Sequence, residues 1–162
     1  MKITIENQLR AWLFHILGSA MMLGCLWYLN FDPIFAVVFG IYWLIYTIPA
    51  LALYIEYLII NKGQEIEIGQ NKLIVNNSNG ETRSYEIKDL DKIIVYKSAS
   101  MDKGGIPLLS SESFYYARIK AKSGLDIIIT CLMSHDVDKV VRKLSGVSYE
   151  RRKTLFAFIF LG

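Results

Sequence analysis

Cys131 and His135 are the side chains whose types and spacing first suggest chemistry. An imidazole four residues from a thiol can activate it as a nucleophile, and the same two groups can bind a metal ion. These residues, however, straddle a predicted strand-to-helix junction, and no third or fourth ligand follows at suitable spacing. We therefore expect Cys131 to be a small buried apolar residue. We predict no metal site and no cofactor.

Other motifs that resemble catalytic elements lack the partners they require. Lys103-Gly104-Gly105 does not have the spacing of a phosphate-binding glycine loop, and Ser110-Ser111 has no base nearby in the sequence. The sequence thus offers no catalytic constellation, and we predict that the protein is not an enzyme.

His15 and Glu56 are ionisable residues within otherwise apolar segments. Ionisable groups inside a membrane are costly and mark functional contacts. His15 is expected to hydrogen-bond to lipid headgroups or to a neighbouring helix. Glu56 can reach the membrane surface, or it can pair with His15 or with a partner. Both are candidate intramembrane polar contacts.

Two groups of basic residues are candidate lipid-binding or partner-binding sites. Arg118, Lys120 and Lys122 alternate with small apolar residues, so they share one face of a predicted strand. Such a face can meet anionic lipid or an acidic partner, or it can simply be solvated. The second group is Arg151, Arg152 and Lys153, which precede a short apolar run.

The segment 147–162 is predicted to form a basic and then apolar tail. Its apolar run, 155–161, is too short to span a bilayer as a helix. A basic cluster followed by aromatic residues is typical of a segment at the membrane interface. Packing of the tail on the rest of the protein, or a truncated third helix, would produce the same pattern.

The elements that must position these residues begin with two apolar segments, 11–29 and 34–60, joined by Asn30-Phe31-Asp32-Pro33. A helix of roughly 20 apolar residues can cross a hydrocarbon core about 30 Å thick. Together, 11–60 is predicted to be a transmembrane helical hairpin behind a short cytoplasmic lead, 1–10. A signal peptide or a lipoprotein lipid-attachment site would leave the second apolar segment unexplained.

The hairpin also predicts orientation and contacts within the membrane. Lys2 and Arg10 precede it and Lys62 follows it, whereas the turn contains no Lys or Arg. The positive-inside rule therefore places both termini in the cytoplasm. The pairs Ala20/Gly24 and Ala36/Gly40 put small residues on one face of each helix. Such faces favour packing within the hairpin or association with a second copy or another membrane protein.

The rest of the chain has the pattern of one small α+β domain. Period-two alternation predicts a strand at 65–68, and turn residues separate it from further strands at 72–76, 82–87, 93–98, 114–122 and 126–133. Apolar residues at helical spacing, from Val137 to Leu144, then predict an amphipathic helix with Ser134 as its N-cap and Gly146 at its end. Acidic residues are interleaved with the basic ones, which argues against a nucleic-acid partner.

Residues 64–146 resemble the pleckstrin-homology-like domains of small bacterial membrane proteins, many of which carry an apolar helical hairpin. The hairpin sequence Gly69–Val75, the link Tyr85–Ile93 into a strand and the terminal helix carry this resemblance. It implies an antiparallel β-sandwich or barrel capped by the C-terminal amphipathic helix, over 61–146. It implies a scaffold and a location more than an activity.

These observations lead to one functional expectation and two alternatives. We expect a non-enzymatic interaction module, anchored in the bilayer as a multi-pass protein of the bacterial inner membrane, with its domain on the cytoplasmic face. Its partners would be the bilayer and a protein, or a second copy bound through the hairpin. The alternatives are an immunity protein against a membrane-acting toxin and an accessory subunit of a membrane enzyme or transporter.

Overall fold

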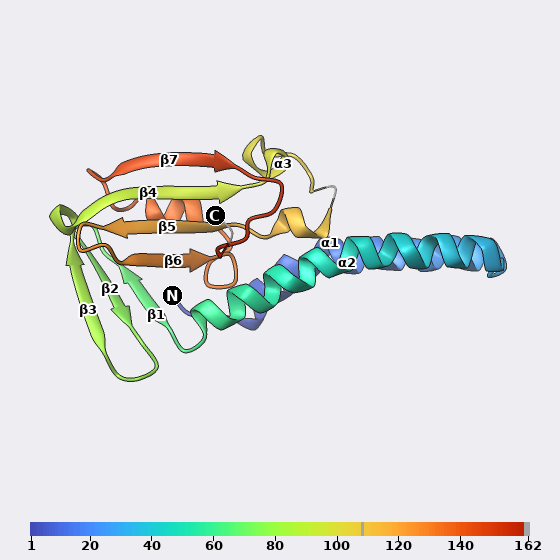
Figure 1. Ribbon diagram of the computed structural model, residues 1–162, viewed down its shortest axis with the longest axis horizontal. Coiled ribbons are helices and arrows are strands. Elements are labelled where there is room, and N and C mark those ends of the chain that lie inside the picture. Colours follow the sequence, from blue (N-terminus) through green and yellow to red (C-terminus); the bar gives the residue numbers. More distant parts are fainter. Residues whose placement is uncertain (108, 161–162) are drawn as a thin grey trace.

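Two long helices form a hairpin that projects from one end of a two-sheet domain in the computed structural model (Figure 1). The structure describes residues 1–107 and 109–160. The helices are α1 (Ile5–Tyr28) and α2 (Pro33–Asn61). The first sheet contains β1 (Glu65–Ile68), β2 (Lys72–Asn76) and β3 (Thr82–Glu86). The second contains β4 (Leu90–Lys97), β5 (Tyr116–Ala121), β6 (Asp126–Thr130) and β7 (Ser148–Lys153). The short helices are η1 (Ile87–Asp89), α3 (Ala99–Asp102), η2 (Ser110–Ser113) and α4 (Val137–Val141).

Both hairpin helices are long and apolar enough to cross a membrane, with mean hydropathies of 1.4 and 2.1 over their most apolar windows. Helix α1 begins six residues earlier than predicted, at Ile5, because the Thr4 hydroxyl accepts a hydrogen bond from the Asn7 N–H and caps the helix there. Figure 1 shows α2 bending part-way along its length, and Pro49 lies within this helix.

The turn of the hairpin is explained by its residues. Asn30 adopts a left-handed conformation, and the N–H groups of Asn30 and Phe31 bond to the carbonyls of Trp27 and Leu26, which closes α1. Asp32 then accepts hydrogen bonds from the first N–H groups of α2, and Pro33 occupies the first helical position. The turn therefore contains a helix stop followed at once by a helix start.

The small residue at which the two hairpin helices pack closely is Gly18, not the predicted Gly24 or Gly40. A Cβ added at Gly18 would lie 3.0 Å from the Tyr46 hydroxyl, whereas one added at Gly24 or Gly40 would meet no atom within 4 Å. The helices approach closely near Gly18, and an apolar groove of about 290 Å³ lies between them farther out, with Gly40 in its lining.

The two sheets enclose the core of the domain. Strand β1 pairs with β2 and β2 with β3, all antiparallel, as do β4 with β5 and β5 with β6. The cross-strand neighbours Ile93, Ile119 and Ile127 are buried, as are Ile66 and Leu73 on the first sheet. Alternation in the sequence predicts these strands, and the arrangement is consistent with the α+β, PH-like fold that the resemblance implies.

The C-terminal part differs from the prediction in three ways. Helix α4 is only five residues long because the N–H groups of Lys143 and Leu144 bond to carbonyls three residues back, which tightens the last turn. Its N-cap is Asp136, not Ser134. The segment 147–162 is also not wholly a tail, since β7 pairs with β4 in parallel and extends the second sheet beyond residue 146.

Candidate functional site

The junction between hairpin and domain is where most of the candidate polar residues meet. The segment between β4 and β5 places η2 against both α1 and α2 (Figure 1). His15 is 8% exposed there, and its Nδ1 lies 3.0 Å from the Ser110 Oγ. Its ring stacks on Tyr46 and meets the edge of Trp12. The prediction of a hydrogen bond to lipid headgroups or to a neighbouring helix differs from the structure, in which His15 bonds to Ser110 of the domain.

Asn61, the last residue of α2, ties the hairpin to the second sheet. It is fully buried, and its side-chain amide donates to the Ile128 carbonyl at 2.9 Å and to the Gln64 side chain at 3.1 Å. Its oxygen accepts from the Thr130 hydroxyl at 2.7 Å. All the hydrogen-bonding groups of this amide thus have partners, which fixes the end of α2 on β6.

Glu56 lies one turn earlier in α2 and holds the C-terminal segment. Its carboxylate accepts hydrogen bonds from the N–H of Ile159, at 3.1 Å to each oxygen, and from the N–H of Phe160 at 2.9 Å. The adjacent Tyr57 hydroxyl donates to the Ala157 carbonyl at 2.8 Å. Glu56 does not pair with His15. It binds backbone that lies just over 100 residues away in sequence.

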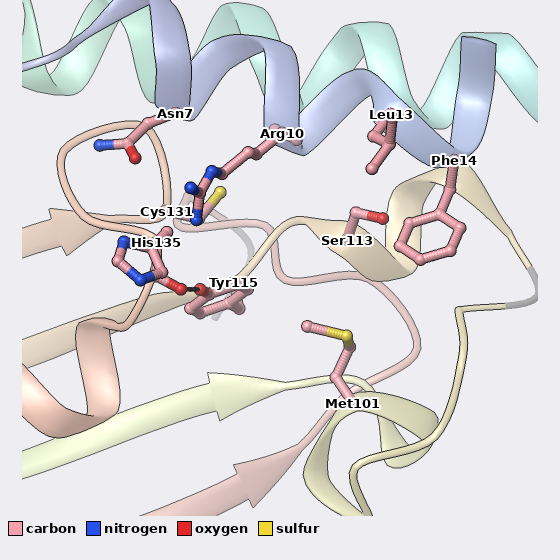
Figure 2. Close-up of a pocket in the computed structure, with 10 residues that line it drawn as sticks. Asn7, Arg10, Leu13, Phe14, Met101, Ser113, Tyr115, Cys131 and His135 are labelled. Atoms are coloured by element: carbon pink, nitrogen blue, oxygen red, sulfur yellow. Dashed lines mark hydrogen bonds between the residues drawn. The ribbon is translucent and has the colours of Figure 1, made fainter. Parts of the chain in front are cut away.

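A groove of about 240 Å³ lies beside this junction, between α1 and the domain (Figure 2). Figure 2 shows Arg10, Leu13 and Phe14 projecting from α1 toward the domain. Arg10 is exposed and pairs with Glu6 at 2.7 Å. The complete lining is Asn7, Arg10, Ala11, Leu13, Phe14, Met101, Ser113, Tyr115, Cys131 and His135.

Burial keeps two side chains of this groove, Cys131 and Tyr115, in their neutral forms. Burial raises the pKa of the Cys131 thiol to about 12, so the thiolate that a nucleophile requires is not available near neutral pH. Burial also raises the pKa of Tyr115, whose hydroxyl donates to the His135 carbonyl. Within residues 1–107 and 109–160, no cluster of three or more His, Cys, Asp or Glu side chains could hold a metal ion.

The three residues of the predicted basic face on β5 lie in different environments. Arg118 donates a hydrogen bond to the Ile159 carbonyl at 2.8 Å, and its guanidinium lies over the rings of Tyr96 and Tyr116. Lys120 follows on the same face of the strand, whereas Lys122 lies beyond the end of β5, in the turn. Arg118 therefore contacts the C-terminal segment, and binding of lipid or a partner by the three residues stays a prediction.

The second basic group, Arg151, Arg152 and Lys153, lies on β7 and pairs with acidic side chains. Arg152 pairs with Glu150 at 2.7 Å, and Lys153 with Asp102 at 3.4 Å. Arg151 pairs with Asp102 and Asp138. These charges are largely compensated within the domain.

Asp138 on α4 is a buried charge centre that sequence reasoning missed. Burial opposes its ionisation, but hydrogen bonds from Tyr149 at 2.6 Å and Arg142 at 2.8 Å, with the charges of Lys97 and Arg151, lower its pKa to about 2. Only Arg142, four residues after Asp138, has a spacing that the sequence signals. The other partners come from β4 and β7, which are distant from Asp138 in the sequence pattern.

The short apolar tail packs on the outer face of the second sheet. Ala157 and Ile159 are buried, whereas Leu155 and Phe160 are largely exposed. The Tyr116 hydroxyl donates to the Phe158 carbonyl at 3.3 Å, so the segment lies across β5. Residues 154–160 therefore pack on the domain, which is one of the arrangements that the sequence left open for this segment.

Comparison with known proteins agrees with this geometry. A family model described as a PH domain matches residues 2–139, which include both hairpin helices and the strands β1 to β6. No curated protein and no solved structure matches the chain. The predicted resemblance to PH-like domains is confirmed by the family match and by the fold of the two sheets. The chain belongs to this PH domain family.

Proposed function

We propose that the protein is a membrane-anchored, non-enzymatic interaction module, in which the hairpin spans a bilayer and holds the PH-like domain on its cytoplasmic face. The observation that carries this proposal is the hairpin itself. Every residue from Ile16 to Ile45 is exposed or half-buried, and Asp32 in the turn is the one charged side chain among them. An apolar surface of this extent is unfavourable in water and favourable in lipid.

The distribution of charge supports the orientation. Lys2, Arg10 and Lys62 all lie at the end of the hairpin that carries the domain, whereas the turn at the other end contains neither Lys nor Arg. The positive-inside rule then assigns the domain to the cytoplasm.

The length of the uncovered hairpin supports a domain seated against the membrane. The domain covers α1 as far as His15 and α2 from Tyr46 onward. The uncovered parts, Ile16–Tyr28 and Pro33–Ile45, are each about 20 Å long, which is shorter than a hydrocarbon core of about 30 Å. The end of the domain nearest the hairpin turn must therefore enter the interface if the hairpin spans the bilayer.

The loop at that end of the domain has the composition this position requires. Residues 104–111 contain no charged side chain, and Ile106 is 73% exposed. Figure 1 shows the described residues of this loop, 104–107 and 109–111, at the end of the domain that lies along the hairpin. An exposed isoleucine there would be buried in lipid, with Lys103 able to reach the headgroups.

Anchoring is tested by placing a charge in the hairpin. Leu44→Lys puts a cation near the middle of α2, which costs about 3 kcal/mol and reduces insertion roughly 100-fold. Leu125→Lys is the matched control, because the two leucines are 51% and 45% exposed and Leu125 lies in the domain. We expect the wild-type and control proteins to resist alkaline extraction from membranes and the Leu44 variant to be released. Equal release of both variants would contradict the proposal.

A further inference from the structure

We propose that the groove between α1 and the domain binds one anionic phospholipid, with its phosphate at Arg10 and the upper part of an acyl chain along Leu13, Phe14 and Met101. This inference rests on the proposed membrane anchoring. It assigns a ligand to the groove of Figure 2, whose lining includes no residue of strands β1 and β2.

The lining of the groove changes from polar to apolar along α1. Asn7 and Arg10 lie at the end remote from the hairpin turn, and Leu13 and Phe14 lie about one helical turn closer to it. Met101 continues the apolar part from the domain side (Figure 2). A phospholipid in the adjoining leaflet has the same polarity, since its headgroup faces the cytoplasm and its chains point toward the membrane interior.

The depth of Arg10 matches that of a headgroup. Arg10 and Tyr28 are 18 residues apart on α1, which corresponds to about 27 Å along the helix axis. If Tyr28 lies at the far boundary of a hydrocarbon core of about 30 Å, the backbone of Arg10 lies close to the near boundary. Its guanidinium is then at the level of the phosphates, where an arginine can form two parallel hydrogen bonds with an anion.

The polar groups of the groove can receive an anion. Arg10 pairs with Glu6 through one terminal nitrogen, and a guanidinium has five N–H donors. Ser113 is 7% exposed, and its hydroxyl has no hydrogen-bond partner among the described residues. Figure 2 shows this hydroxyl directed toward Phe14 and away from Arg10. A buried hydroxyl without a partner is destabilising, and an oxygen of a lipid headgroup or ester would relieve that cost.

Charge and volume narrow the choice of lipid. The lining contains Arg10 and no Asp or Glu, so it offers no carboxylate to the ammonium of a zwitterionic headgroup. A volume of about 240 Å³ corresponds to roughly eight water molecules, which is enough for a phosphate and a few methylene groups. The remainder of the chains would stay in the bilayer.

Lipid retention by the full chain tests this assignment. The wild-type protein, Arg10→Gln and Arg83→Gln would be reconstituted in vesicles of phosphatidylcholine and phosphatidylglycerol, floated, extracted gently and analysed by native mass spectrometry. Arg83 is a matched control because it is 48% exposed and pairs with Glu81, as Arg10 is 52% exposed and pairs with Glu6. We expect one retained phosphatidylglycerol in the wild type and the control, and about tenfold less in Arg10→Gln.

The outcomes separate this inference from the proposed function. If all three proteins float with the vesicles but retain phosphatidylglycerol equally, or none of them retains it, the lipid site is refuted and the membrane anchor stands. Release of the lipid by inorganic phosphate would refute a site that includes the acyl chain. If the wild-type protein does not float, both proposals fail together.

Discussion

Glu56→Gln should release the C-terminal segment from the hairpin without unfolding the domain. Glu56 is 7% exposed, and its two carboxylate oxygens accept the N–H groups of Ile159 and Phe160. Glutamine has nearly the same shape, but it replaces one acceptor oxygen with an NH₂ group. The NH₂ group would face backbone N–H groups, which are also donors. The substitution also removes the negative charge that strengthens both hydrogen bonds.

The magnitude follows from the contacts that change. Hydrogen bonds to charged groups contribute about 1.5–3 kcal/mol each, and the substitution leaves one neutral acceptor in place. A net loss of about 2 kcal/mol for docking of the segment is therefore expected, which is roughly a 30-fold increase in its opening equilibrium. The effect should be local, because the segment lies on the outer face of the sheet and not in the core between the sheets.

Hydrogen exchange of the full chain in detergent measures this effect directly. Amides of residues 154–160 should exchange roughly 30-fold faster in Glu56→Gln, with no change in the strands of the second sheet. Glu67→Gln, an exposed carboxylate on β1, is the control and should leave the exchange of residues 154–160 unchanged. Unaltered exchange in Glu56→Gln would show that the carboxylate does not hold the segment.

Three further predictions concern the junction, the charge centre and the membrane-facing loop. Asn61→Leu leaves the Thr130 hydroxyl and the Ile128 carbonyl without partners, so it should lower the free energy of unfolding by about 3 kcal/mol in chemical denaturation, and a change near zero would contradict the network. The pKa of Asp138 is lowered to about 2 in the folded protein, so the ionised carboxylate contributes about 2 kcal/mol to the free energy of unfolding. This contribution is fully present above about pH 4 and is lost as the pH falls toward 2. Asp138→Asn should therefore flatten the dependence of the free energy of unfolding on pH in this range. In a Cys25→Ala background, a fluorophore at Ile106→Cys should be quenched by brominated lipid, whereas one at Ser123→Cys, in the distant β5–β6 turn, should not.

Local sequence patterns account for the hairpin and for most strands. Strands β1 and β2 have the predicted bounds because strict alternation and the turn Gly69-Gln70-Asn71 define both their faces and their ends. The two hairpin helices are also predicted by a local signal, because each apolar run is long enough to cross a membrane and the runs of the domain are not. The buried positions Val137, Val141 and Leu144 also follow from helical spacing, although the helix itself is short.

Strand β7 could not be predicted in the same way. Its sequence, Ser148 to Lys153, is nearly all polar and shows no alternation of apolar residues. The strand lies at the edge of the sheet, where its side chains form ion pairs. Its parallel pairing with β4 joins residues more than 50 positions apart, and a parallel pair leaves no turn signal between its strands.

The partners of the candidate site residues depend on contacts of the same long range. His15 meets Ser110 and Glu56 meets Ile159, at separations of 95 and 103 residues. Sequence identified both as unusual because ionisable groups are rare in apolar helices. It could not show that the domain and its C-terminal segment supply the partners, because these contacts exist only once the domain has docked on the hairpin.

The orientation of the chain in a membrane is the most direct test of the central claim that the hairpin spans a bilayer and holds the domain on the cytoplasmic side. In a Cys25→Ala background, where the remaining Cys131 is 4% exposed, single cysteines would be placed at Phe31 in the hairpin turn and at Ser78 in the β2–β3 turn. An impermeant thiol reagent added to intact cells should label the Phe31 site and should reach the Ser78 site only after permeabilisation. Labelling of Ser78 in intact cells would contradict the account.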